Sequence, residues 1–207
     1  MATNYNILAG HQLERVSALS DGIFAVAMTL LVLDIHVPEV GDIHTEAELA
    51  GALMRLGPPA ATWLLSMMTL GIFWLGQQAQ LSQLKDADRN LSWLHFLFLA
   101  IITAVPFTTR LLASYFDFRL AFTIYWLNIL LCGIGLYLTW GYAERARLTG
   151  EDPPGAISKA IRRRIVRAQG LYFIGLLAGM VNPIFGIVII LFVETSYALG
   201  LKWTDRT

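Results

Sequence analysis

Six long apolar stretches constrain the fold of this chain more than any other feature of its sequence. A helix needs about 20 mostly apolar residues to cross the hydrocarbon core of a bilayer. Stretches of this kind cover residues 16–37, 58–81, 91–114, 120–142, 164–181 and 183–201. Hydrophobic residues make up 56% of the chain and charged residues only 14%, whereas soluble domains carry about 25% charged residues. We therefore predict an all-α, polytopic membrane protein with six transmembrane helices, formed as one domain over residues 1–207.

Two of these stretches need an argument beyond hydropathy. The fifth has Arg164, Arg167 and Gln169 in its first turns, so its arginines have to reach towards the membrane interface. A single bent helix across Asn182-Pro183 would be too long for one bilayer, so we expect a tight turn there that separates two spans.

Residues 1–14 lack the basic and apolar regions of a cleavable signal peptide. The first span is therefore expected to remain in the mature protein.

Lysine and arginine are distributed unequally between the two sides of the membrane. With six spans, one side holds both termini and the connections near residues 82–90 and 143–163. Of the 15 basic residues, 12 fall on this side: Arg15, Lys85, Arg89, Arg145, Arg147, Lys159, Arg162, Arg163, Arg164, Arg167, Lys202 and Arg206. Because cytoplasmic loops carry the excess of Lys and Arg, we predict a multi-pass protein of the cell membrane with both termini cytoplasmic. Residues 45–56 predict a short helix on the outer side.

Composition and absent motifs exclude several classes of protein. Basic and acidic residues number 15 each, so the formal net charge is zero and nothing favours a nucleic-acid partner. Cys132 is the only cysteine, and the sequence has no CxxC cluster of metal ligands. The patterns G-x-S-x-G, H-E-x-x-H and the Walker loop are also absent. We therefore predict no catalytic residues, no metal site and no cofactor, and a protein that is not an enzyme.

The first apolar stretch combines polar residues with two distinct helical faces. Its start carries Glu14, Arg15, Ser17, Ser20 and Asp21, at a depth where charge is costly. The residues Val26, Thr29, Leu30 and Leu33 follow the i, i+3, i+4, i+7 spacing and form one stripe. At about 100° per residue, Ser17, Ser20 and Asp21 fall on the opposite side. One face can thus be anchored within its own subunit while the other meets something else, or both faces can be ordinary packing.

Part of this stretch resembles a known signature. Residues 15–21 (RVSALSD) resemble the R-x-x-x-F-S-D signature of the transmembrane protein 175 family of potassium channels, with Leu19 in place of Phe. The continuation over residues 22–35 is similar to the first helix of that family. So is Val105-Pro106-Phe107-Thr108, which Leu111, Leu112 and Tyr115 follow. In the motif Trp74-x-x-Gln77, Gln77 occupies the position at which the family often has His. The resemblance covers nearly the whole chain and identifies a prokaryotic member.

The resemblance implies a potassium-permeable channel without a re-entrant pore loop. Prokaryotic members carry one six-helix repeat and assemble as homotetramers, and this sequence has one signature. In the family the first helix lines a central pore, and its apolar rings fall here on Val26, Leu30 and Leu33, with the Thr29 hydroxyl between them. Such a pore closes by dewetting, and it implies K⁺ as the permeant ion with modest preference over Na⁺. Val26 is smaller than the Ile or Leu common at the narrow ring, which implies a looser constriction.

The same resemblance implies roles for the polar residues around the pore helix. They form a network behind it, with expected partners on the second and third spans: Arg15, Ser17, Ser20, Asp21, Gln77 and Asn90. This network either takes part in gating or is purely structural. Asp34 lies at the outer end of the first span, where it would attract cations to the pore mouth or form a solvated helix end.

Three further features are open to more than one interpretation, and a fourth, a pair of glycines, indicates no function. Glu194 in the last span is an ion or proton relay, or it pairs within the bundle or reaches water. His95 is a buried hydrogen-bonded histidine or a metal ligand. The basic cluster of residues 162–167 binds anionic headgroups of membrane lipids or only sets topology. The pair Gly175 and Gly179 can bring two helices close without indicating a function.

Two other functions compete with a channel on the residues alone. A secondary transporter of a small cation would show inverted repeats and broken helices at the midplane, and the sequence shows neither. A membrane-embedded binding or assembly module would not need the apolar stripe with Thr29 beside a separate polar anchor.

Overall fold

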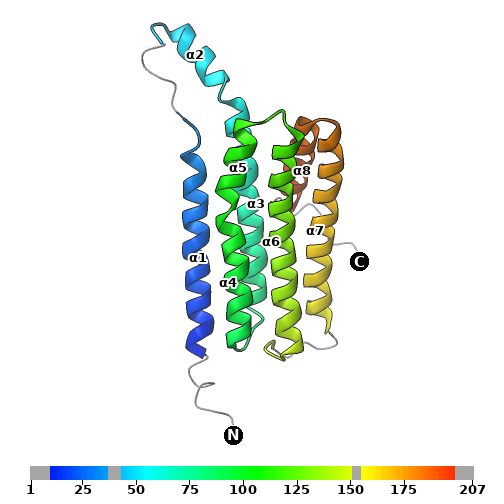
Figure 1. The fold of residues 1–207 in the computed structure, drawn as a ribbon. Coiled ribbons are helices and arrows are strands. Elements are labelled where there is room, and N and C mark those ends of the chain that lie inside the picture. The colour runs from blue at the N-terminus through cyan, green and yellow to red at the C-terminus, as the bar shows by residue number, and fades with distance from the viewer. Residues whose placement is uncertain (1–9, 37–42, 151–154, 199–207) are drawn as a thin grey trace.

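The computed structural model describes residues 10–36, 43–150 and 155–198, with the side chains of residues 10–12 left aside. Helices account for nearly all of these residues, and Figure 1 shows them as a bundle of long, roughly parallel and antiparallel rods. They are α1 (Gly10–Val32), α2 (Glu46–Met54), α3 (Gly57–Leu81), α4 (Arg89–Thr103), α5 (Val105–Ser114), α6 (Arg119–Arg145), α7 (Ala156–Val181) and α8 (Pro183–Ala198). The predicted all-α membrane fold is confirmed.

Five helical segments are long and apolar enough to cross a membrane. They are Leu13–Val32 within α1, all of α3, the α4–α5 pair, α6 and α7. The sixth predicted span corresponds to α8, a shorter apolar helix whose expected end at residues 199–201 lies outside the described part. The 16 residues of α8 that the structure describes span about 24 Å at about 1.5 Å per residue.

The third predicted span is not one continuous helix. A single helix over 91–114 was expected, but α4 ends at Thr103 and α5 begins at Val105. Pro106 stands in the first turn of α5 and has no N–H to continue the ladder of α4. The backbone tightens at the junction, where the N–H of Ala104 donates to the carbonyl of Ile101 at 3.1 Å. The two helices are stacked in line in Figure 1, so the pair still makes one crossing.

Helix boundaries differ from the predicted ones at α1 and α7. Helix α1 ends at Val32, earlier than residue 37, and Asp34 lies in the turn that follows. Helix α7 starts at Ala156, eight residues before the expected 164, because the basic segment is also helical. Lys and Arg have good helix propensity, so hydropathy missed a helical segment that is too polar for the membrane core.

The turn between α7 and α8 and the helix on residues 45–56 agree with the prediction. Asn182 has an extended backbone, and its Oδ1 accepts a hydrogen bond from the N–H of Ile184 at 2.9 Å. Helix α2 begins with a capping box, in which Thr45 accepts from the N–H of Glu48. The backbone N–H groups of His44 and Thr45 donate to the Glu48 carboxylate, and these bonds lower the pKa of Glu48. In Figure 1, α2 projects from one end of the bundle.

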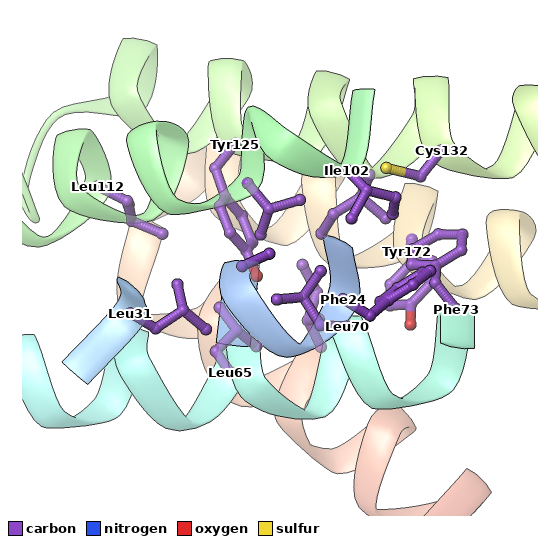
Figure 2. Close-up of a cluster of buried hydrophobic side chains, with 14 of the residues drawn as sticks. Phe24, Leu31, Leu65, Leu70, Phe73, Ile102, Leu112, Tyr125, Cys132 and Tyr172 are labelled. Carbon is purple, nitrogen blue, oxygen red and sulfur yellow. The ribbon is translucent and has the colours of Figure 1, made fainter. Parts of the chain in front are cut away.

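The core lies between α1, α3, α4–α5, α6, α7 and α8. Figure 2 shows Phe24 and Leu31 of α1 pointing towards Leu65 and Leu70 of α3, with Tyr125 of α6 beyond them. Helix α1 packs along α3, α4 and α5 and lies at one edge of the bundle. This edge position leaves the outer side of α1 without a neighbour among the described residues.

Candidate ion pathway on the first helix

Helix α1 has a buried face that holds it to the bundle. Ser20, Phe24, Ala27 and Leu31 repeat at i, i+4, i+7 and i+11, and each is at most 2% exposed. Burial of such side chains stabilises the attachment by about 1.5–3 kcal/mol for each large apolar residue. The helix is therefore seated on α3, α4 and α5 in one rotational setting.

The predicted pore stripe lies on the opposite face of α1, except for Leu33, which lies in the turn that follows the helix. Val26 is 58% exposed, Leu30 45% and Leu33 68%. Thr29 is also exposed, and its hydroxyl donates to the carbonyl of Val26 at 2.9 Å. Because that donor is used within the helix, the lone pairs of the hydroxyl oxygen remain available to a cation. The predicted stripe is thus one continuous exposed strip of apolar side chains with a hydroxyl in its middle.

Ser20 anchors α1 through a buried histidine of α4. A hydrogen bond of 2.7 Å joins Ser20 Oγ and His95 Nε2, and the Gln77 amide nitrogen of α3 lies 2.8 Å from the same His95 atom. All three side chains are buried. Gln77 was an expected partner of this network. His95 was not named as one, although it is the residue that joins Gln77 to Ser20.

Asp21 makes a second, more exposed attachment to α3. Its Oδ1 accepts hydrogen bonds from Trp74 Nε1 at 2.8 Å and from Gln78 Nε2 at 2.6 Å. Trp74 and Gln78 lie four residues apart, which places them on the same side of α3. The spacing of Trp74 and Gln77 in the sequence signalled this part of α3, but Gln78 was missed.

The remaining expected members of the network lie elsewhere. Arg15 is exposed on the same side of α1 as the stripe, and Ser17 is partly buried. Asn90 is exposed at the start of α4, where it interacts with Tyr142 of α6. Tyr142 also donates to Asp88, the residue that caps α4. Asn90 is therefore part of the α4–α6 contact rather than a neighbour of Ser20 or Asp21.

Asp34 at the end of the stripe is paired with a basic residue. Its Oδ1 lies 3.7 Å from Arg110 Nε of α5, and the Asp34 side chain is 17% exposed. The position is neither an unpaired carboxylate nor a fully solvated helix end. Arg110 partly neutralises the charge that a passing cation would meet.

Relatives with a similar sequence decide the family. A potassium channel of Streptomyces collinus is 33% identical over 158 residues, which covers 72% of this chain and 74% of the relative. The chain belongs to the TMEM175 family. The family model, described as the endosomal/lysosomal potassium channel TMEM175, matches residues 15–106. A potassium channel of Chamaesiphon minutus is 32% identical over 164 residues, covering 77% of this chain and 80% of the relative.

A solved structure of a TMEM175 homologue has the same fold. The crystal structure of a lysosomal potassium-selective channel TMEM175 homologue from Chamaesiphon minutus superposes with a TM-score of 0.78 at 25% identity. The match covers 95% of this chain and all of that one. The resemblance inferred from residues 15–21 is confirmed, and the relatives are channels rather than enzymes, as predicted.

The stretch matched by the TMEM175 family model contains the α1 stripe and its anchors. Residues 15–106 include Ser20, Asp21, Trp74, Gln77 and His95. The two attachments between α1 and its own bundle, through Ser20 and through Asp21, therefore lie within the matched segment.

A second buried polar network lies deeper in the bundle of this TMEM175-family chain. Thr69 of α3 donates to the carboxylate of Glu194 of α8, and the Tyr172 hydroxyl of α7 donates to the same oxygen at 3.4 Å. Tyr125 of α6 lies 3.2 Å from both Thr69 Oγ1 and Ser66 Oγ. Glu194 thus pairs within the bundle, which is one of its predicted interpretations. It joins α3, α6, α7 and α8 through contacts that hydropathy does not reveal.

Metal ligands do not gather in the described part of the chain. No group of three or more His, Cys, Asp or Glu side chains is placed to hold a metal ion among those residues. His95 is buried and hydrogen-bonded to Ser20, as one of its two interpretations predicted.

Proposed function

We propose that this chain is one subunit of a homotetrameric, potassium-permeable cation channel of the cell membrane, with α1 of each subunit lining a central pore. The observation that carries the proposal is the exposed strip formed by Val26, Thr29 and Leu30 on α1 and by Leu33 in the turn after it, while the other face of α1 is held to its own bundle. Four such strips facing one axis would enclose a path with apolar rings and hydroxyl oxygens. Membership in the TMEM175 family, whose named prokaryotic relatives are potassium channels, supports the same function.

The chemistry of the strip suggests how ions are selected. Rings of Val26, Leu30 and Leu33 offer no oxygen cage, so they would control conduction by wetting and dewetting. Selection would then depend on how readily an ion sheds or keeps its hydration water, with help from the Thr29 hydroxyl. K⁺ holds its water less tightly than Na⁺, so this pore would prefer K⁺ only modestly.

The distribution of charge supports an orientation with both termini in the cytoplasm. The start of α1 lies at the same end of the bundle as the α3–α4 and α6–α7 connections in Figure 1. These connections contact each other, because the N–H of Lys85 donates to the carbonyl of Leu148 at 2.8 Å. The basic residues of both connections therefore gather at one end, and the positive-inside rule supports a cytoplasmic position for that end.

Ion flux from liposomes tests the channel and its pore. Purified protein should release K⁺ passively and faster than Na⁺, and Val26→Phe should lower K⁺ flux by at least about tenfold by filling the narrow ring. The matched control is Val188→Phe on α8, because Val188 is 57% exposed and Val26 58%. Unchanged flux in Val26→Phe contradicts the pore assignment. Flux that saturates and requires a second solute indicates a transporter instead.

Cysteine cross-linking tests the assembly separately. Val26→Cys should form disulfide-linked subunits on oxidation, because residues of one narrow ring approach each other around the axis. Val188→Cys is the control, and the native Cys132 is fully buried and should stay unreactive. Cross-linking at Val188 but not at Val26 would place a different helix at the subunit contact.

A further inference from the structure

We infer that Arg15 forms a ring of positive charge at the cytoplasmic mouth of the proposed pore and limits the entry of K⁺ from that side. The ring rests on the proposed function, because it requires four copies of α1 around one axis. Arg15 was expected in the polar network behind the pore helix. It is instead exposed on the side of α1 that carries the strip.

Helical geometry places Arg15 in line with the narrow ring. Helix α1 is continuous from Gly10 to Val32. At about 100° per residue, the step from Arg15 to Val26 is three full turns and about 20°. The two residues therefore share one side of the helix, about 16 Å apart along its axis. Leu19 lies between them on the same side and is 49% exposed, so the exposed strip continues through Leu19 to Arg15.

The same geometry directs Arg15 away from its own bundle. Phe24 lies about 180° around the helix from Arg15, and it is 1% exposed and packs in the core. Neither of the ion pairs found in the described part of the chain involves Arg15. If α1 presents Val26 to a central axis, it therefore presents Arg15 to the same axis.

The neighbouring acid lies on a different side of α1. Glu14 is exposed and is about 100° around the helix from Arg15, but within about 20° of Asp21. Asp21 accepts hydrogen bonds from Trp74 and Gln78, so this flank of the helix is turned towards α3. The negative charge of Glu14 is thus on the α3 flank, and the positive charge of Arg15 is on the strip.

A ring of four arginines would act on ions according to the side from which they come. The start of α1 lies at the end of the bundle that we propose to be cytoplasmic (Figure 1). Four unit charges at about 10 Å, one Debye length at 0.1 M salt, lower the local concentration of K⁺ about two- to threefold. K⁺ that leaves the cell meets this ring before the narrow ring, whereas K⁺ that enters meets it last. Outward current should therefore be smaller than inward current.

Single-channel recording from inside-out patches tests the ring, with the full-length chain expressed in cells and about 50 mM KCl on both sides. Arg15→Gln should raise the outward current about two- to threefold and leave the inward current nearly unchanged. Arg15→Lys keeps the charge and should keep the wild-type ratio, and Arg15→Glu should reverse it. At about 1 M KCl the Debye length is about 3 Å, so these differences should disappear.

The matched control is Arg89→Gln, because Arg89 is exposed at the start of α4, at the same end of the bundle. It should leave the current ratio unchanged. An equal effect of Arg89→Gln would show a diffuse surface charge and overturn the ring. A ratio that does not follow the charge at residue 15, or a change confined to the inward current, would also overturn it.

Val26→Phe separates the ring from the pore assignment. If this variant blocks the current while the Arg15 variants behave like wild type, the pore stands and the ring is wrong. If Val26→Phe leaves the current unchanged, the pore assignment is wrong and the ring falls with it.

Discussion

Ser20 of α1 and His95 of α4 are joined by a hydrogen bond of 2.7 Å, although 75 residues separate them in the sequence. This bond and the contact of His95 with Gln77 are the buried polar link between α1 and the bundle. Ser20 Oγ also lies 2.7 Å from the carbonyl oxygen of Val16, to which it can donate, so Ser20 keeps one partner if His95 is lost. Gln77 would keep no such partner, because its Oε1 already makes no hydrogen bond among the described residues.

Replacing His95 with Phe, which keeps a planar aromatic ring but removes both ring nitrogens, should destabilise the protein. The change leaves the Gln77 amide without its partner, and an unpaired buried polar group costs about 1–3 kcal/mol. Thermal unfolding of purified protein measures the effect. His36→Phe is the control, because His36 is exposed after α1. Equal Tm values for His95→Phe and wild type would show that the link does not hold α1 in place.

Replacing Arg110 with Gln should increase K⁺ conductance. The change removes the cation that lies 3.7 Å from Asp34 Oδ1 and leaves the carboxylate free to attract ions to the end of the strip. Single-channel recording at about 50 mM and 500 mM KCl measures it, and the increase should shrink at high salt because of screening. Arg119→Gln is the control, since Arg119 contacts the carbonyl of Val181 instead. A gain of the same size in both variants would argue against Asp34 as the cause.

Replacing Glu194 with Ala should destabilise the bundle by at least about 2 kcal/mol. The change opens a cavity and removes the acceptor of the Thr69 and Tyr172 hydroxyls. Glu194→Gln keeps an acceptor oxygen of nearly the same shape and should lose much less stability. Unfolding midpoints of the two variants measure the difference. If Glu194→Gln abolished flux with an unchanged midpoint, the carboxylate would have a direct part in conduction.

Replacing Gly186 with Ala should separate α7 from α8. A Cβ at Gly186 would lie 2.8 Å from the Gly179 Cα and 2.4 Å from Phe122 Cζ, and the backbone atom cannot move aside. Overpacking of this kind costs about 1–3 kcal/mol. Gly170→Ala is the control, because a Cβ there has no neighbour within 4 Å. It should be neutral or slightly stabilising in the same unfolding measurement.

Local patterns in the sequence determined several parts of this structure. Hydropathy predicted the membrane segments, because about 20 apolar residues in a row meet the bilayer requirement regardless of their neighbours. The pair Asn182-Pro183 predicted the turn between α7 and α8, because proline disfavours a helical backbone at the residue before it. The periodicity of α1 predicted that Val26 and Leu30 lie on a different face of the helix from Ser20, because helical geometry alone sets which residues share a face.

Only the tertiary structure decided which residues meet across helices. The pairs Ser20 with His95, Asp34 with Arg110 and Thr69 with Glu194 join separate helices, and no local pattern encodes their register. Asn90 shows the same limit, because it was expected near α1 but lies beside Tyr142. Which segments form helices depends on short-range backbone geometry and on hydropathy, and both can be read directly from the sequence. Side-chain partners depend on how whole helices pack against one another, which is a property of the folded bundle.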